Sequence, residues 1–224
     1  MSAVYSTGDF RLPRQKMAES AMIGTRMPSP IGHVVAGIAV AWAADLVPGD
    51  RAWRTAPNGA SWYRRGGGGL TLACAAIAAA PDLDLLLVAH RTVTHSIGAV
   101  LFVGLFCAAL AANAHRPIAR VGLMCAAAYA SHLFLDWLGT DATPPHVIVA
   151  LWPLSREWFI SGTDVFRQTE RREVWTSATM LKNLRAIVQE IAILGPTAAA
   201  VWLVRVKTLA GLAPQVARRD HPAQ

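Results

Sequence analysis

The sequence has few charged residues for its length. Only 16% of its 224 residues are Asp, Glu, Lys or Arg, whereas a soluble globular domain carries about 25%. Hydrophobic residues make up 54% of the chain, and the mean hydropathy of +0.35 is high for a soluble protein. The shortage of charge therefore argues against a soluble domain and favours an integral membrane protein.

Cysteine is also scarce, and its spacing excludes the usual cysteine-based sites. Cys74, Cys107 and Cys125 each lie in an apolar run, and none belongs to a CxxC pair. A thiolate zinc site or a redox motif needs such closely spaced pairs. The three side chains are therefore expected to be small buried hydrophobic groups.

The basic residues form no stripe interleaved with aromatics, which argues against a nucleic-acid surface. The formal net charge is +7, but Lys and Arg are scattered over the polar connections between apolar runs. Charge of this kind is typical of contact with anionic lipid headgroups. The membrane lipid bilayer is the expected partner, and no nucleic acid is expected.

Apolar runs of helix length recur along the chain and predict an all-α fold. They cover residues 31–47, 70–80, 96–114 and 121–138, with a weaker fifth run at 187–204. A helix that crosses the hydrocarbon core needs about 20 apolar residues, so 96–114 is the clearest span and 70–80 is short. We expect a polytopic helical membrane protein, an antiparallel bundle of about four to five transmembrane helices.

The stretch PDLDLLLVAHRTVTHS, residues 81–96, interrupts this apolar pattern with ionisable groups. Pro81 suits the first position of a renewed helix and disfavours helix at Ala80, so a helix break is predicted between them. The stretch joins the second and third apolar runs and carries five ionisable residues, Asp82, Asp84, His90, Arg91 and His95.

Antiparallel helices would bring further ionisable residues to the same end of the bundle. His33 lies at the start of the first run, and His132 and Asp136 lie near the end of the fourth. In an up-down-up-down bundle, the starts of odd-numbered helices and the ends of even-numbered helices share one membrane face. Seven residues are therefore expected at that face: His33, Asp82, Asp84, His90, His95, His132 and Asp136.

The spacing of these residues favours metal ligation. His132 and Asp136 are four residues apart, which places them on one helical face about 6 Å apart, the spacing that supplies two ligands in HExxH sites. Charged groups at membrane depth are costly unless they are paired or bound to a metal. His90 and His95 share no face of a straight helix, and His95 is the preferred ligand of the two.

The donor set indicates which metal and which chemistry to expect. Imidazole and carboxylate without thiolate suit Zn(II), our first expectation, and also Mn(II) or Fe(II). A mononuclear catalytic zinc needs three protein ligands, so six are enough for two ions with open positions for water. The six candidate ligands are His33, Asp82, Asp84, His95, His132 and Asp136.

The remaining polar residues receive other roles. Asp84 or His90 would act as general base, and Arg91 would pair with a carboxylate or neutralise charge on an anionic substrate oxygen. Asp45 and Glu190 fall outside the cluster and are expected only to pair helices through polar contacts.

Five motifs together resemble the YdjM-like family of bacterial inner-membrane proteins. They are GHxxxG at 32–37, PDLD at 81–84, HRxxTHS at 90–96, HLxLDxL at 132–138 and LWPLS at 151–155. The resemblance covers about 28–155, and the family is described as membrane-bound metal-dependent hydrolases. It implies a multi-pass protein of the inner (cytoplasmic) membrane, with site roles for His33, Asp82, Asp84, His90, His95, His132 and Asp136.

The expected function is that of a membrane-bound metal-dependent hydrolase, in which a metal-activated water attacks an ester or phosphoester. A site at headgroup depth favours a lipid-like substrate. The alternative is a membrane transporter or a metal or proton channel that uses the same cluster, which would need polar groups across the full membrane. A haem protein with His33 and His132 as axial ligands is a third reading.

These expectations divide the chain into five parts. Residues 28–155 form the membrane-embedded metal-site domain, and 156–186 form an extramembrane polar segment. Residues 187–205 form a weak final transmembrane helix. The disordered parts are an N-terminal extension, 1–27, and a tail, 206–224.

Overall fold

The structure, a computed structural model, describes most of the helical part of the chain. His90 and Arg91, two of the residues assigned catalytic roles above, lie outside the described residues. The described residues are 3–5, 28–47, 66–86, 93–140, 148–170 and 173–220.

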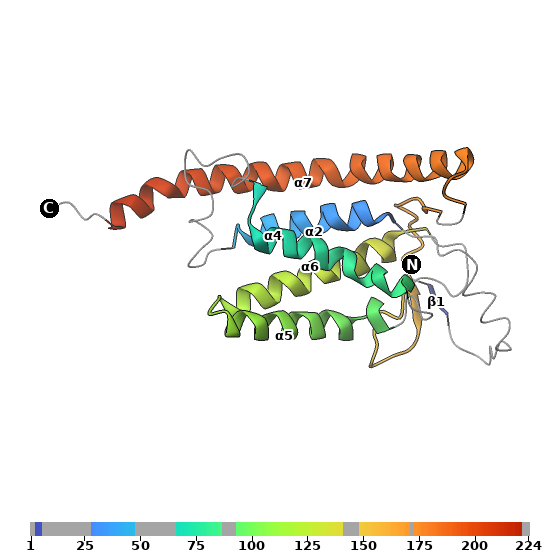
Figure 1. Cartoon of the computed structure of the whole chain (residues 1–224), viewed down its shortest axis with the longest axis horizontal. Helices are drawn as coiled ribbons and strands as arrows, with labels where there is room; N and C mark the ends of the chain where they lie inside the picture. Colours follow the sequence, from blue (N-terminus) through green and yellow to red (C-terminus); the bar gives the residue numbers. More distant parts are fainter. Residues whose placement is uncertain are drawn as a thin grey trace.

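Helices dominate the described residues, as predicted. The α-helices are α2 (Pro30–Ala44), α4 (Gly69–Ala79), α5 (Ile97–Asn113), α6 (Ile118–Leu138) and α7 (Ser177–Asp220). Two short 3₁₀ helices are η2 (Ala80–Leu86) and η3 (Val93–His95), and two short strands, β1 (Ala3–Tyr5) and β2 (Trp158–Ile160), pair antiparallel. Figure 1 shows α2, α4, α5 and α6 as a bundle, with the long α7 lying along one side.

Helix α6 is the central element of this bundle. It packs against α2, α4 and α5, while α7 packs mainly on α2. One core cluster, Ala41, Cys74, Met124 and Ala128, joins α2, α4 and α6. The small side chains in this cluster let the helices approach closely, as is usual in membrane bundles.

Gly37 sets the separation between α2 and α4. A Cβ atom at this position would lie 2.6 Å from both the Ala78 Cβ and the Cys74 carbonyl oxygen. Because this separation is far shorter than van der Waals contact, any side chain at residue 37 would push α4 away from α2. The glycine therefore allows the close approach of α2 and α4.

The predicted break before Pro81 is present. Helix α4 ends at Ala79, and the chain continues as the 3₁₀ helix η2 from Ala80 to Leu86. The tighter winding after the break changes the directions of the side chains that follow it. The break thus supplies the irregular backbone that the aspartates of the PDLD motif need to serve the same site.

Apolar side chains cover the outer faces of the bundle. Leu101, Phe102, Leu105 and Phe106 of α5 are each more than half exposed. Two helical stretches, Ile118–Leu138 and Ser177–Thr208, are long and apolar enough to cross a membrane, and Pro30–Ala44 and Ile97–Asn113 are shorter apolar helices. Faces of this kind suit lipid contact rather than water.

Helix α7 is longer than predicted at both ends. The sequence assigned residues 187–205 to the final helix, but α7 begins at Ser177 and continues to Asp220, into the stretch expected to be a disordered tail. Hydropathy detects only the apolar part of a helix, whereas good helix formers such as Ala, Leu, Lys and Arg extend it at each end. Pro196 is accommodated within the helix.

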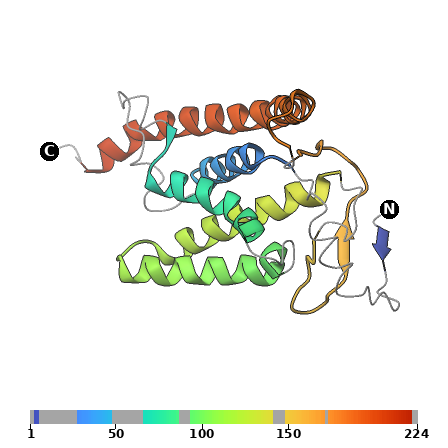
Figure 2. The same ribbon diagram turned by 45° about the vertical axis from the view of Figure 1, so that its right-hand side comes forward.

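The segment after position 155 makes contacts with the helical bundle. Phe166 is buried against Ala36 of α2 and Leu135 of α6, and its carbonyl oxygen accepts a hydrogen bond from the Thr140 N–H. Figure 2 shows the segment that carries β2 beyond the end of α6, returning toward α7. Part of the segment 156–186 is therefore packed against the bundle, and its extramembrane location stays a prediction.

Substituting Gly37 tests the helix approach. Gly37→Ala should destabilise the protein by about 1–3 kcal/mol, because the new methyl group overpacks the α2–α4 contact. Thermal unfolding of the purified protein in detergent should show a midpoint lower by roughly 2–10 °C. Gly69→Ala is the control, since a Cβ at Gly69 meets nothing within 4 Å. Equal midpoints for the two variants would contradict this role.

Candidate metal centre

Six predicted site residues meet at one end of the bundle, as the antiparallel arrangement predicted. They come from four elements, of which α2 and α6 lie far in sequence from η2 and η3. The side chains of His33, His95 and His132 have no solvent exposure, and the three aspartates are buried. The contributors are His33 of α2, Asp82 and Asp84 of η2, His95 of η3, and His132 and Asp136 of α6.

Three donor atoms at the centre form a nearly equilateral triangle. Nε2 of His132 lies 3.1 Å from Nε2 of His95. Oδ2 of Asp136 lies 3.3 Å from the first nitrogen and 3.4 Å from the second. Ligands of a tetrahedral zinc, bonded at 2.0–2.1 Å, are about 3.3 Å apart. The triangle therefore has the dimensions of three ligands around one ion.

A second group of donors adjoins the first. His33, Asp82 and His132 also offer ligand atoms within 4.8 Å of one another. Nε2 of His33 lies 3.5 Å from Oδ1 of Asp136, and Nε2 of His132 lies 3.7 Å from Oδ1 of Asp82. Because one imidazole nitrogen binds one ion, His132 can serve only one of the two groups. The two oxygens of Asp136, however, face different histidines.

The imidazole of His132 is oriented by the backbone of α4. Its Nδ1 lies 2.7 Å from the Ala78 carbonyl oxygen, which can only accept a hydrogen bond. Nδ1 therefore carries the proton, and Nε2 presents its lone pair to the centre. Ala78 packs beside Gly37, so the close approach of α2 and α4 also holds this carbonyl in place.

Asp84 contacts the outer nitrogen of the His95 ring. Its Oδ2 lies 3.3 Å from Nδ1 of His95, on the ring nitrogen opposite the one that faces the centre. Metal-binding histidines commonly place their outer nitrogen against a carboxylate, which fixes the orientation of the ring. This contact is that of a residue that orients His95, and the roles of Asp84 as a ligand and as a general base stay predictions.

Thr94 and Tyr129 support this arrangement and were missed from the sequence. The Thr94 hydroxyl donates to Oδ2 of Asp84 and also lies 3.0 Å from Nδ1 of His95. Tyr129 on α6 donates its hydroxyl to the Thr94 carbonyl oxygen at 2.7 Å. The position of Thr94 directly before His95, inside the HRxxTHS motif, was the available signal. The signal for Tyr129 was weaker, since it only precedes His132 by one turn.

Glu190 connects α7 to the site end of α2. It is fully buried, and its carboxylate accepts hydrogen bonds from the Ser29 N–H, at 2.6 Å, and from the Ser29 hydroxyl. Ser29 caps α2 by accepting from the Gly32 N–H, and a Cβ at Gly32 would lie 2.7 Å from Glu190. The expected helix-pairing role is present, and its partner is the turn that leads into His33.

A second polar cluster lies at the opposite end of α2. Asp45 accepts from Nε of Arg205 at 2.7 Å and from Nη2 of Arg120 at 2.5 Å. These contacts join α2, α6 and α7, and the Arg205 side chain is 1% exposed. Asp45 therefore pairs helices, as expected from its position outside the metal centre.

The geometry also bears on a haem site. Axial histidines bind a haem iron from opposite faces of the porphyrin. The rings of His33 and His132 instead stack with centroids 3.7 Å apart and planes 22° from parallel. This contact leaves no room for a macrocycle between the rings, so the bis-histidine reading is not supported.

Fold and centre together define a helical membrane protein with a buried His/Asp cluster that can hold a metal ion. The chain belongs to the family described as YdjM inner membrane protein, whose model matches residues 27–212. The match extends the resemblance seen in the sequence motifs through most of α7. No curated protein matches the chain, and no solved structure matches it.

Removing one corner of the triangle should remove the metal. His132→Ala and Asp136→Ala should each lower the zinc content of the purified protein at least about tenfold, because two ligands alone bind zinc weakly. Inductively coupled plasma mass spectrometry measures the ratio of metal to protein. His115→Ala, at the opposite end of the bundle, should keep the wild-type ratio. Unchanged zinc in both site variants would contradict the assignment.

Glu190 should affect the centre through α2. Glu190→Ala leaves Ser29 without its buried acceptor and frees the turn before His33, so zinc affinity should fall about tenfold, as for other residues that orient ligands. Glu190→Gln keeps one acceptor oxygen and should recover most of that affinity. Competition with a zinc-binding dye measures both variants. Ile191→Ala, on the exposed side of α7, is the control, and wild-type affinity in Glu190→Ala would refute the coupling.

Proposed function

We propose that this protein is a multi-pass membrane hydrolase of the bacterial inner membrane that uses a divalent metal to cleave an ester or phosphoester. The observation that carries the proposal is the triangle formed by His95, His132 and Asp136, whose edges of 3.1–3.4 Å match ligand spacing around one ion. Membership of an inner-membrane family supports the location. The two helices long enough to cross a membrane, α6 and α7, and the shorter apolar helices α2 and α5 support the expected passage of about four to five spans.

The donors fit a divalent ion, with Zn(II) as the first choice. The centre offers three imidazoles and carboxylates, all buried, and no cysteine belongs to either donor group. Hard or borderline ions such as Zn(II), Mn(II) and Fe(II) prefer such donors. When bound here, a divalent ion would supply a Lewis acid that activates water and polarises the substrate oxygen.

Two sets of residues in this centre would each hold one metal ion. His95, His132 and Oδ2 of Asp136 would hold one ion. His33, Asp82 and Oδ1 of Asp136 are placed to hold a second, since Asp136 turns its two oxygens toward different histidines. This assignment uses His132 once and retains five of the six predicted ligands.

Residues around the metal-binding side chains fix the orientation of those side chains and exclude water from them. The Ala78 carbonyl fixes the tautomer of His132, and Asp84 with Thr94 holds the outer nitrogen of His95. Preorganised ligands need no rearrangement when the reaction occurs. Asp84 is engaged in this way, so His90 is the remaining candidate for the general base, and Arg91 for charge neutralisation; both remain predictions.

The position of the centre favours a lipid-like substrate. His132 and Asp136 lie in the last two turns of α6, one of the helices long enough to span the membrane. Such residues lie near the headgroup level, where the ester and phosphoester bonds of membrane lipids are found. The apolar cluster of Ala41, Cys74, Met124 and Ala128 fills the bundle beyond the centre, which favours a hydrolase over a transporter or channel.

Hydrolysis can be tested with the purified full-length protein in detergent. With added zinc, it should cleave p-nitrophenyl butyrate, bis(p-nitrophenyl) phosphate or a phosphatidylglycerol. Asp136→Ala should lower the rate at least about a hundredfold, because the residue holds the group that activates water. His115→Ala is the control for preparation and handling.

A different pair of results would reject the proposal. Zinc-loaded protein that cleaves none of the three probes, yet carries zinc or protons across proteoliposome membranes, would identify a transporter. Hydrolysis that is equal in wild type and Asp136→Ala would place the activity outside this centre.

A further inference from the structure

A groove with two arginines runs between α7 and the segment that follows β2. Its volume is about 400 Å³. None of its residues belongs to the metal centre, so an inference from it does not rest on the proposed hydrolase activity. The lining residues are Arg167, Leu184, Arg185, Val188, Gln189 and Ala192.

One wall of the groove is held firmly in place. Gln189 of α7 donates from its side-chain nitrogen to the Val165 carbonyl at 3.1 Å and accepts from the Arg167 N–H at 3.1 Å. Phe166, between these two contacts, is 2% exposed and packs into the bundle. The backbone that carries Arg167 is therefore anchored on both sides, while the Arg167 side chain itself is exposed.

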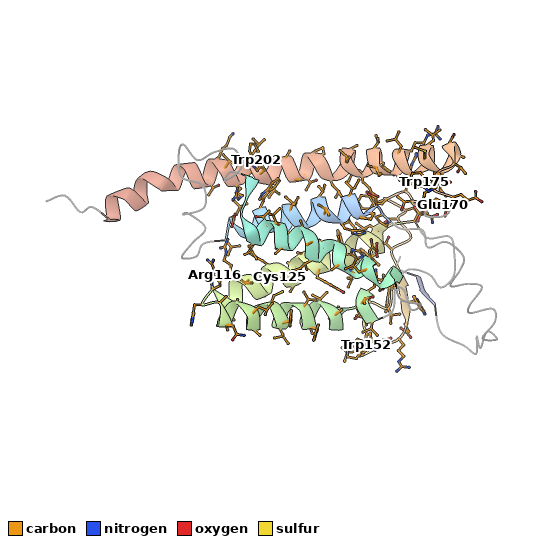
Figure 3. All side chains as sticks on the ribbon, viewed as in Figure 1. Arg116, Cys125, Trp152, Glu170, Trp175 and Trp202 are labelled. Carbon is orange, nitrogen blue, oxygen red and sulfur yellow. The ribbon has the colours of Figure 1, made fainter. Side chains whose placement is uncertain are left out.

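The position of the groove along α7 suits a site where a lipid headgroup meets the acyl chains. Trp175, 90% exposed, precedes α7, and Trp202 lies near the other end of its apolar part (Figure 3). Trp202 follows the first residue of α7 by 25 residues, about 38 Å of helix. This length is close to the 40–45 Å of a bilayer with its headgroups, where tryptophans mark both interfaces.

Between these two tryptophans, the lining of the groove changes from charged to apolar along α7. Arg185 precedes the apolar run that begins at residue 187, and Val188 and Ala192 lie within that run. Ala192 is about 10 Å further along the helix than Arg185. A molecule with a charged head and a long apolar tail matches this sequence of surfaces.

The described lining of the groove is positively charged. Its lining includes two arginines and no carboxylate. The nearby acid Glu170 pairs with Lys182 at 3.3 Å. Arginine is well suited to phosphate because its planar group can donate two parallel hydrogen bonds.

We propose that the groove binds an anionic phospholipid. Arg167 and Arg185 contact its phosphate, and one acyl chain lies along Leu184, Val188 and Ala192. The lipid would tie the segment that carries Phe166 to α7 at the same end of the bundle as the metal centre. The ligand is a membrane component and not a soluble anion, because the apolar floor continues from the arginines into the depth of the bilayer.

Native mass spectrometry of the full-length protein, released from detergent, tests this proposal. The probes are a phosphatidylglycerol and a phosphatidylcholine with the same acyl chains. Wild type should retain phosphatidylglycerol preferentially. Arg167→Gln with Arg185→Gln should weaken its binding about tenfold, since each arginine near an anionic headgroup contributes favourably. The control is Arg116→Gln with Arg156→Gln, which changes the net charge equally at exposed arginines outside the groove and should stay within twofold of wild type.

A second pair of variants tests the apolar floor without changing charge. Ala192→Trp should fill the groove and lower retention of phosphatidylglycerol, whereas Ala199→Trp, two turns further along α7, should not. Equal loss in the groove and control arginine variants would overturn the proposal, as would equal retention of the two lipids by wild type. Two further results together would show a simple anion site and also overturn the proposal. They are displacement of the lipid by millimolar inorganic phosphate and wild-type retention of phosphatidylglycerol in Ala192→Trp.

Discussion

Asp136 sets the constraint on which the rest of the structure depends. Its carboxylate is buried in the bundle, and its two oxygens lie 3.3–3.5 Å from the Nε2 atoms of three histidines. A carboxylate in such surroundings is costly unless positive charge compensates it. A divalent ion bound among these donors would supply that charge. The cluster of histidines around Asp136 is thus an arrangement that can compensate the burial of its carboxylate.

Contacts between the helices hold those donor atoms in their positions relative to one another. Gly37 lets α4 approach α2 closely enough for the Ala78 carbonyl to accept from His132. Glu190 fastens the first turn of α2 to α7 through Ser29. At the other end, Asp45 joins α2, α6 and α7 through two arginines. Polar contacts between helices are effective in a membrane, where apolar packing alone gives little preference for one arrangement.

Much of the helical framework could be predicted from the sequence, because hydropathy reports directly on which segments avoid water. The apolar runs at 96–114 and 121–138 correspond closely to α5 and α6. Helix α7 was harder, since its polar ends carry no hydropathy signal and only propensity marks them. The meeting of His33, His132 and Asp136 could also be predicted, because antiparallel order alone brings their helix ends together.

The sequence by itself determined which residue types reach the site and at which end of the bundle. Its helix lengths, its alternating directions and the break at Pro81 are local properties of the chain. Only the tertiary structure decided what each residue touches there. It placed Asp84 on the outer nitrogen of His95, turned the two oxygens of Asp136 toward different histidines, and joined Glu190 to Ser29 across 161 positions. These outcomes depend on helix rotation and separation, which arise from packing between distant segments and leave no periodic signal in the chain.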